Sequence, residues 1–208
     1  MTATDVSTPD STEDTPPVLF PRLLPWILGI CATLGLAASF TLTVEKFELT
    51  ANPDYVTSCD ISPVLNCGSI MDTSQAALFG FPNSLIGLIG FSALLAIAVM
   101  MGRKPSALVM LGMQVGLTAG VVFVHWLIFQ SLYRIDALCP YCMVVWVVTI
   151  VAFCYVSLRN ADDHIHDGFG RTLVNAALSI HSLIPVVWIL VIAGLIGQHF
   201  WWYWSTLI

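Results

Sequence analysis

Long apolar runs alternate with short polar segments along almost the whole chain. Each run falls within the range of about 17–25 residues that an α-helix needs to cross the hydrocarbon core of a membrane. The pattern therefore predicts five membrane-spanning helices, over residues 23–43, 85–101, 106–129, 138–158 and 173–197.

The polar segments between these runs predict the remaining organisation of the chain. Residues 1–20 are rich in Ser, Thr, Asp and Pro and predict a disordered cytoplasmic tail, because they have little apolar surface to offset the entropy of ordering. Residues 45–82 predict a long extracytoplasmic loop that contains a short interfacial helix near residues 68–79. Residues 161–171 predict a cytoplasmic connector, and residues 172–208 a fifth membrane helix with an aromatic tail.

Composition supports an all-α integral membrane protein. The chain is 57% hydrophobic and only 10% charged, with a mean hydropathy of +0.85. Soluble domains carry about a quarter charged residues, so that class is excluded. The formal net charge of −6 also excludes a basic surface for nucleic acid.

The basic residues predict the orientation of the chain. Membrane proteins concentrate Lys and Arg in cytoplasmic segments. A cytoplasmic N-terminus leaves only Lys46 and Arg134 outside. It places the other basic residues inside: Arg22, Arg103, Lys104, Arg159 and Arg171. With this topology both cysteine pairs lie on the extracytoplasmic side, where disulfides persist.

The six cysteines form two pairs and two single residues. Cys139 and Cys142 enclose Pro140 and Tyr141 at the start of the fourth predicted helix. Unpaired N–H groups and the dipole at a helix start favour a thiolate on Cys139, which indicates a redox-active pair. A structural disulfide is one alternative. A metal site is another, but it needs four convergent ligands, and we predict none.

The other pair, Cys59 and Cys67, is consistent with a second exchange pair on a mobile loop or with a simple staple of that loop. Cys31 and Cys154 lie within apolar runs, where a thiol packs as a small hydrophobic group. His125 could carry protons, because ionisable groups within membrane spans are often functional. We favour the alternative that it makes a structural hydrogen bond.

A Pro82-Asn83-Ser84 sequence opens the second predicted span on the outer side. One of its two polar side chains is expected to cap the helix. If Ser84 is the cap, Asn83 is left free to contact a ligand at the membrane mouth, and both alternatives for Asn83 stay open.

Cys59-Asp60, Cys67, Pro82-Asn83-Ser84 and Cys139-Pro140-Tyr141-Cys142, in this order, resemble the bacterial branch of the vitamin K epoxide reductase family over about residues 22–160. The resemblance implies that residues 21–160 form a four-helix catalytic domain around a quinone of the menaquinone, ubiquinone or vitamin K type. It implies that Asn83 donates to a quinone carbonyl. Asp60 and Thr73 match supporting positions of the family, and Trp146 stands where the animal enzymes have a quinone-contacting Tyr.

These observations predict a dithiol:quinone oxidoreductase of the cell (inner) membrane. Cys59 would take electrons from a partner, Cys67 would pass them to Cys139, and Cys142 would face the quinone. Many bacterial relatives continue into a thioredoxin-like domain, which this sequence lacks. We therefore expect a separate, DsbA-like partner of thioredoxin fold. The alternative is a non-enzymatic membrane binding or transport protein with structural disulfides on its outer face.

Overall fold

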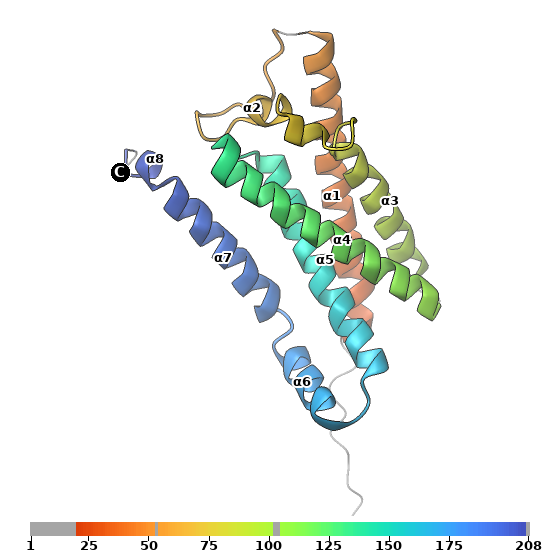
Figure 1. Cartoon of the computed structure of the whole chain (residues 1–208). Coiled ribbons are helices and arrows are strands. Elements are labelled where there is room, and N and C mark those ends of the chain that lie inside the picture. The colour runs from red at the N-terminus through yellow and green to blue at the C-terminus, as the bar shows by residue number, and fades with distance from the viewer. Residues whose placement is uncertain (1–19, 53, 102–104, 207–208) are drawn as a thin grey trace, which may run out of the picture.

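The computed structural model describes residues 20–52, 54–101 and 105–206, and four long helices form its central bundle (Figure 1). They are α1 (Phe20–Ala51), α3 (Ser84–Met100), α4 (Ala107–Gln130) and α5 (Pro140–His164). α3 packs along α1, and both α1 and α4 pack along α5. The described ranges contain no β-strand, so the predicted all-α bundle is confirmed. The predicted tail lies outside the described residues except for Phe20.

Apolar side chains cover both the inside and the outside of this bundle. Leu28, Ala32 and Val156 are fully buried between helices, whereas Trp26 and Ile89 are largely exposed. Helices that are apolar all round are typical of membrane spans. α1, α5, and α4 with its helical extension are each long and apolar enough to cross a membrane, whereas α3 has only 17 residues.

The first helix is longer than the apolar pattern predicts. We expected it to end near Thr43, but α1 continues to Ala51. Glu45, Lys46 and Glu48 therefore belong to a helix that projects beyond the apolar region, rather than to the loop. Glu, Lys, Leu and Ala are good helix formers, so the helix continues where the hydropathy falls.

The polar stretch before the fourth helix is also helical. A π-helical turn, η2 (Ser131–Ile135), extends α4 without a break. Asp136 then ends the helix with a left-handed backbone (φ 56°). The turn places residues 137–139 beneath the loop, directly before α5.

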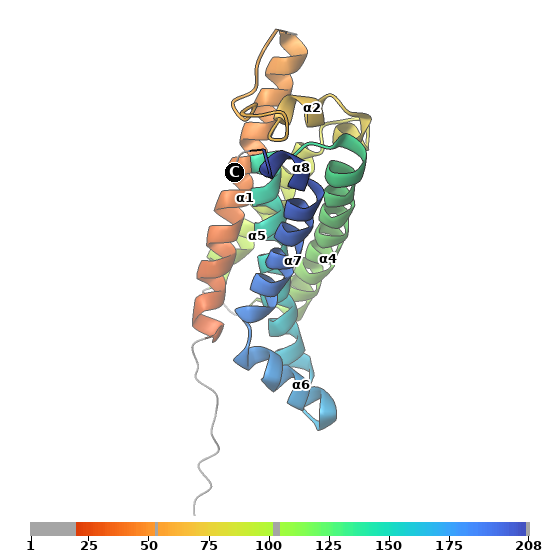
Figure 2. The same ribbon diagram turned by 90° about the vertical axis from the view of Figure 1, so that its left-hand side faces the viewer.

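The fifth predicted helix is broken, contrary to expectation. α6 (Gly168–Ser179) and α7 (Leu183–His199) meet at an angle of 70°. Pro185 lacks the N–H that would bond to the carbonyl of His181, so a continuous helix through residues 180–182 would lose a hydrogen bond there. Figure 2 shows α7 running along the bundle, where α6 and α7 both pack against α5.

The loop between α1 and α3 covers one end of the bundle. It contains α2 (Cys67–Met71) and the 3₁₀ turn η1 (Ser74–Ala77). The short helix α8 (Trp201–Trp204) lies at the same end (Figure 1). Phe200 is fully buried in a cluster with Val64 and Leu138, so the aromatic tail packs partly onto the protein. Trp201 and Trp202 stay exposed.

Candidate functional site

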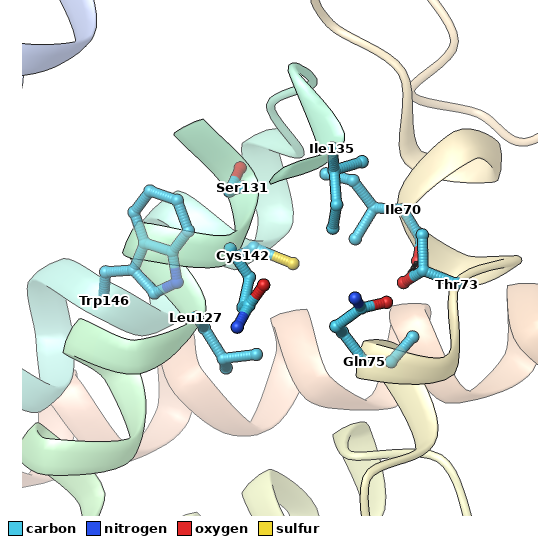
Figure 3. A pocket seen from close by; sticks show the side chains of 10 residues that line it. Ile70, Thr73, Gln75, Leu127, Ser131, Ile135, Cys142 and Trp146 are labelled. Atoms are coloured by element: carbon cyan, nitrogen blue, oxygen red, sulfur yellow. Dashed lines mark hydrogen bonds between the residues drawn. The ribbon is translucent and has the colours of Figure 1, made fainter. Parts of the chain in front are cut away.

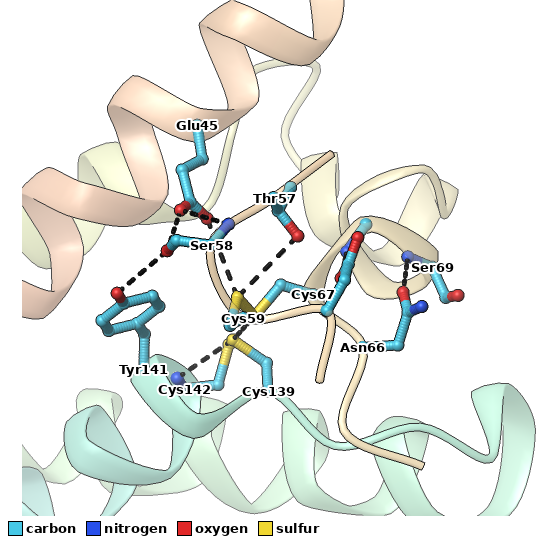
Figure 4. Close-up of a disulfide and its surroundings, with 12 residues drawn as sticks. Glu45, Thr57, Ser58, Cys59, Asn66, Cys67, Ser69, Cys139, Tyr141 and Cys142 are labelled. Carbon is cyan, nitrogen blue, oxygen red and sulfur yellow. Dashed lines mark hydrogen bonds between the residues drawn. A yellow bond between two sulfur atoms is a disulfide. The ribbon is translucent and has the colours of Figure 1, made fainter. Parts of the chain in front are cut away.

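The four paired cysteines meet where the loop touches the start of α5 (Figure 4). Cys59 and Cys67 form a disulfide with a Cα–Cα distance of 5.6 Å. Cys139 Sγ lies 3.0 Å from Cys67 Sγ. Cys139 and Cys142 are free thiols. A third sulfur at the contact distance of a disulfide is the arrangement that thiol–disulfide exchange requires, because exchange passes through attack of one sulfur on a bonded pair.

Backbone pairing between the loop and the start of α5 sets this distance. The N–H of Leu138 donates to Val64 O at 2.7 Å, and the N–H of Asn66 donates to Leu138 O at 3.0 Å. Asn66 also caps α2 by accepting from the N–H of Ser69 at 2.6 Å. Cys67 is therefore fixed at the first position of α2, and Cys139 directly follows the paired residue Leu138.

Asp60 strengthens the same corner of the loop. Its carboxylate accepts from the N–H of Gly68 at 3.1 Å. Burial opposes ionisation, but hydrogen bonds from the Thr57 hydroxyl and from the N–H groups of Gly68, Cys67 and Thr57 lower the pKa of Asp60 below its ordinary value. The charged side chain thus supports the N-terminus of α2, which carries Cys67.

Cys139 occupies the N-cap of α5 and has the environment of a stabilised thiolate. Its Sγ accepts from the N–H of Cys142 at 3.4 Å. A hydrogen bond from the thiol of Cys142 is the main cause that lowers the pKa of Cys139 below its ordinary value, and the N–H groups of Cys142 and Tyr141 lower it further. Burial and the negative charge of Glu45 raise the pKa and so oppose this effect. The sequence prediction of an acidic first cysteine agrees with this geometry.

The loop cysteines are buried, although we expected a cysteine pair on an extracytoplasmic loop to be reachable from solvent. Cys59 is 2% exposed and Cys67 is fully buried. Both pack with Leu42, Met71 and Cys139 in one apolar cluster. The loop is closed over its own disulfide because the Leu65–Leu138 bridge and α1 hold it from two sides.

Cys142 lines a large cavity inside the bundle. The cavity has a volume of about 1050 Å³ and is walled by residues of α1, α3, α4 and α5. Asn83, Phe91, Trp126 and Trp146 are also among its lining residues. Small-molecule sites typically measure about 300–1,000 Å³ and are mostly apolar with a few polar groups. This cavity meets that description, with a thiol in its wall.

A second cavity of about 40 Å³ lies between the loop and the ends of α4 and α5 (Figure 3). Thr73, Cys142 and Trp146 line it, and Thr73 donates its hydroxyl proton to Ile70 O at 2.7 Å. Trp146 Nε1 and Gln130 Oε1 are the buried side-chain polar atoms that lack a hydrogen-bond partner within the described ranges. An unpaired buried polar group costs about 1–3 kcal/mol, so these two atoms favour a polar group beside Cys142.

Comparison with known families fits this geometry. The model of the vitamin K epoxide reductase family matches residues 26–157, which is more than half of the 208-residue chain. The chain belongs to the vitamin K epoxide reductase family. The matched range contains all four paired cysteines and most of the four-helix bundle, and membership makes the protein a membrane oxidoreductase. No curated protein sequence matches the chain.

In this vitamin K epoxide reductase family member, Asn83 stands at the N-cap position of α3, but its side chain makes no capping hydrogen bond. Its Nδ2 donates to Gln75 O at 2.6 Å and its Oδ1 accepts from the N–H of Leu78 at 3.2 Å. Ser84 Oγ instead accepts from Thr43 Oγ1 at 2.9 Å, so the predicted side-chain cap of α3 is wrong. The backbone of Gln75 and Leu78, in and directly after η1, thus occupies the amide oxygen and one amide N–H of Asn83. An amide nitrogen has two N–H groups, so Asn83 keeps one donor at the cavity wall.

The single residues of the family member have the structural roles we expected. Cys31 and Cys154 are buried thiols in α1 and α5. Trp188 Nε1 donates to His125 Nε2 at 3.0 Å, and His125 Nδ1 bonds to Val121 O at 2.8 Å. Nε2 of His125 thus joins α4 to α7, and Nδ1 bonds within α4 itself.

Glu45, Ser58 and Tyr141 belong to the site of this family member, although sequence reasoning missed them. Ser58 donates to Glu45, and its hydroxyl lies 3.1 Å from Tyr141 OH (Figure 4). Their one signal in the sequence is position, because Ser58 and Tyr141 are next to cysteines. Glu45 has no such signal, since its place depends on how far α1 continues.

Proposed function

We propose that the protein transfers electrons from an extracytoplasmic dithiol partner to a membrane quinone and so supports disulfide formation. The observation that carries this proposal is the row of four cysteine sulfurs, from Cys59 through Cys67 and Cys139 to Cys142, which we call the sulfur chain. The Cys59–Cys67 disulfide touches Cys139 at 3.0 Å, and Cys142, three residues further along α5, lines the large cavity. One end of this sulfur chain thus lies in the loop, and the other end lies at the wall of a cavity large enough for a ligand.

In the proposed sequence, a partner thiolate attacks Cys59 and the bond to Cys67 breaks. The second thiolate of the partner then attacks its own sulfur in this mixed disulfide, which releases the oxidised partner and frees Cys59. Cys67 attacks Cys139 of an oxidised Cys139–Cys142 pair, which releases Cys142 as a thiolate at the cavity wall. Closure of the Cys59–Cys67 disulfide frees Cys139. This end state, with an oxidised loop pair and a reduced inner pair, corresponds to the arrangement in the structure.

The cavity residues fit a quinone. The walls are mainly apolar, which suits a ring with a lipid tail, and Asn83 and Trp146 supply N–H groups that suit its carbonyls. A bound quinone supplies an acceptor for two electrons and two protons. Asn83 and Trp146 would hold it, and Cys142 would deliver the electrons.

We further propose that the partner is a separate DsbA-like protein of thioredoxin fold, that the protein lies in the cell (inner) membrane, and that its N-terminus is cytoplasmic. Arg159 belongs to the last turns of α5 and Arg171 to α6, and α6 lies at the end of the bundle opposite α2, which begins at Cys67 (Figure 1). The positive-inside bias then puts the cysteine end outside the cytoplasm. Arg103 and Lys104 of this bias lie outside the described residues.

The proposal predicts that purified protein in detergent will reduce a short-chain quinone when a reduced thioredoxin-fold dithiol protein is added. Loss of quinone absorbance measures the reaction. Cys139→Ala should abolish it because it breaks the sulfur chain, whereas Cys154→Ala should preserve it because Cys154 only packs. If wild-type protein and Cys139→Ala give the same background rate, the alternative of structural disulfides in a non-enzymatic protein is correct.

A second prediction concerns Asn83. Asn83→Ala should lower quinone-dependent turnover about five- to tenfold, because a lost hydrogen bond costs on the order of 1 kcal/mol. Reduction of the Cys59–Cys67 disulfide by the partner should keep its rate. Ser84→Ala, which removes a hydrogen bond to Thr43 in the same turn, serves as the control. An equal loss in both half-reactions would show that Asn83 acts only by holding residues 75–78.

A further inference from the structure

A buried carboxylate sits beside the loop disulfide, and none of the proposed exchange steps uses it. Glu45 of α1 is only 4% exposed. One oxygen, Oε1, accepts from the N–H of Ser58 at 3.0 Å and from the Ser58 hydroxyl. The other, Oε2, lies 3.7 Å from Cys59 Sγ. The carboxylate is therefore held by one oxygen while the other is directed at a reacting sulfur.

The exchange has one step in which Cys59 needs a base. After Cys67 has attacked Cys139, Cys59 must attack Cys67 in turn to close the loop disulfide. Only a thiolate attacks, and an ordinary thiol with a pKa of about 8.5 is only about 3% ionised at pH 7. The start of α5 stabilises Cys139 as the leaving thiolate, but it does not ionise the attacking Cys59.

The groups around Cys59 single out Glu45 for this task. Thr57 Oγ1, at 3.9 Å from Cys59 Sγ, is neutral. Four other ionisable side chains face this corner from the surrounding elements, and contacts engage each of them elsewhere: Lys46 with Met71 O and Asp72, Asp60 with Gly68, Tyr141 with Ser58, and Cys139 with Cys142. Glu45 is the carboxylate within reach of Cys59 Sγ in the described part of the chain.

We propose that Glu45 is the proton acceptor for Cys59 when the loop disulfide closes. This inference rests on the proposed function. In the step, the Cys59–Cys67 bond forms and the Cys67–Cys139 bond breaks. The electron pair of the broken bond leaves with Cys139 as a thiolate, and the Cys59 proton moves to Glu45 Oε2. No external oxidant is needed, because the Cys67–Cys139 disulfide is consumed.

Ser58 offers the proton a way out. Its side chain is exposed, and its hydroxyl bonds to Glu45 Oε1 and lies 3.1 Å from Tyr141 OH (Figure 4). The hydroxyl can accept a proton from the acid form of Glu45 while it gives its own to water. This contact links a buried sulfur to solvent without opening the loop, and it returns Glu45 to the carboxylate for the next cycle.

The test follows the Cys67–Cys139 disulfide in a single turnover. Full-length protein with both pairs oxidised is mixed with one equivalent of dithiothreitol, quenched with acid at set times, alkylated and analysed by mass spectrometry of non-reduced peptides. We expect the decay of the Cys67–Cys139 species in Glu45→Gln to be about tenfold slower than in wild type at pH 7, because the amide keeps an acceptor for Ser58 but is no base. The matched control is Glu48→Gln, an exposed glutamate one turn away, which should decay at the wild-type rate.

The pH profile separates proton transfer from a structural role. In Glu45→Gln, decay should accelerate about tenfold per pH unit between pH 6 and 8, so that the tenfold deficit at pH 7 closes near pH 8, because solvent then ionises Cys59. Ser58→Ala, on the exposed side, should slow decay severalfold with the same rescue. Equal decay in Glu45→Gln and wild type, or slowing by the same factor at every pH, would show that Glu45 only positions Ser58. If wild type forms no Cys67–Cys139 species at all, the proposed function itself fails.

Discussion

Replacing Cys142 by Ala should abolish quinone reduction completely and leave Cys139 without a partner. Cys139 would then be the single remaining thiol at the start of α5. Without Cys142 it cannot give up two electrons by closing a Cys139–Cys142 disulfide. Its remaining reaction is with Cys67, whose sulfur lies 3.0 Å away. We expect Cys139 to attack Cys67, so that the electron pair leaves with Cys59.

Alkylation makes this disulfide visible. When Cys142→Ala protein is incubated with iodoacetamide at neutral pH, released Cys59 is alkylated and cannot attack back. A peptide pair joined through Cys67 and Cys139, with alkylated Cys59, should accumulate and be detected by mass spectrometry without reduction. Cys154→Ala is the control, because it removes a buried thiol from the same helix and leaves the exchange intact. If Cys142→Ala still reduces quinone, Cys139 delivers the electrons and the order along α5 is wrong.

The sequence predicted the meeting of the cysteines because local rules govern each part. A Cys-x-x-Cys turn at the start of an apolar helix places Cys139 at an N-cap, and counting the spans puts the loop at the same end of the bundle. The contact between Cys67 and Cys139 adds only one element to this, the pairing of Leu65 with Leu138. Two isolated residues that pair through the backbone leave no periodic signal.

The elements that the sequence missed depend on tertiary contacts. Hydropathy ended the first helix near Thr43, although residues up to Ala51 favour a helix, so the position of Glu45 under Ser58 stayed hidden. The burial of Cys59 depends on Leu42 and Met71, which lie on two different elements. Pro185, by contrast, is a local signal for the break before α7, and the prediction of one continuous helix over residues 173–197 did not use it.

The closed loop also changes how a partner must reach the protein. Val56 and Ile61 are both more than 70% exposed and flank the buried Cys59. A thioredoxin-fold partner that packs on these side chains would have to move residues 57–59 away from α1 before its thiolate reaches the sulfur. Access to Cys59 is then a local opening of the loop, and Cys67 stays covered by α2 and α5.

This difference in burial predicts the outcome of removing Cys67. Cys67→Ala should reduce turnover to background, because no second loop thiol remains to pass the electrons on. It should also trap a thioredoxin-fold partner that keeps one active-site cysteine, supplied as its mixed disulfide with thionitrobenzoate: the Cys59 thiolate attacks the partner sulfur, thionitrobenzoate leaves, and no Cys67 remains to break the new bond. Trapping is measured by a mass shift on non-reducing gels. Cys59→Ala should trap nothing, since the remaining thiol, Cys67, is fully buried.

Two results would contradict the assignment of Cys59 as the residue that the partner attacks and of Cys67 as the residue that passes the electrons on. If Cys59→Ala captures the partner while Cys67→Ala does not, Cys67 receives the electrons and the roles of the loop pair are reversed. The sulfurs of Cys59, Cys67 and Cys139 all lie within 4.8 Å of one another, so a direct transfer from Cys59 to Cys139 is the one bypass that the geometry offers. Turnover that persists in Cys67→Ala, together with a Cys59–Cys139 disulfide in its peptides, would show that this bypass operates. We expect neither result, because the loop bridge holds Cys67, rather than Cys59, directly against Leu138 and Cys139.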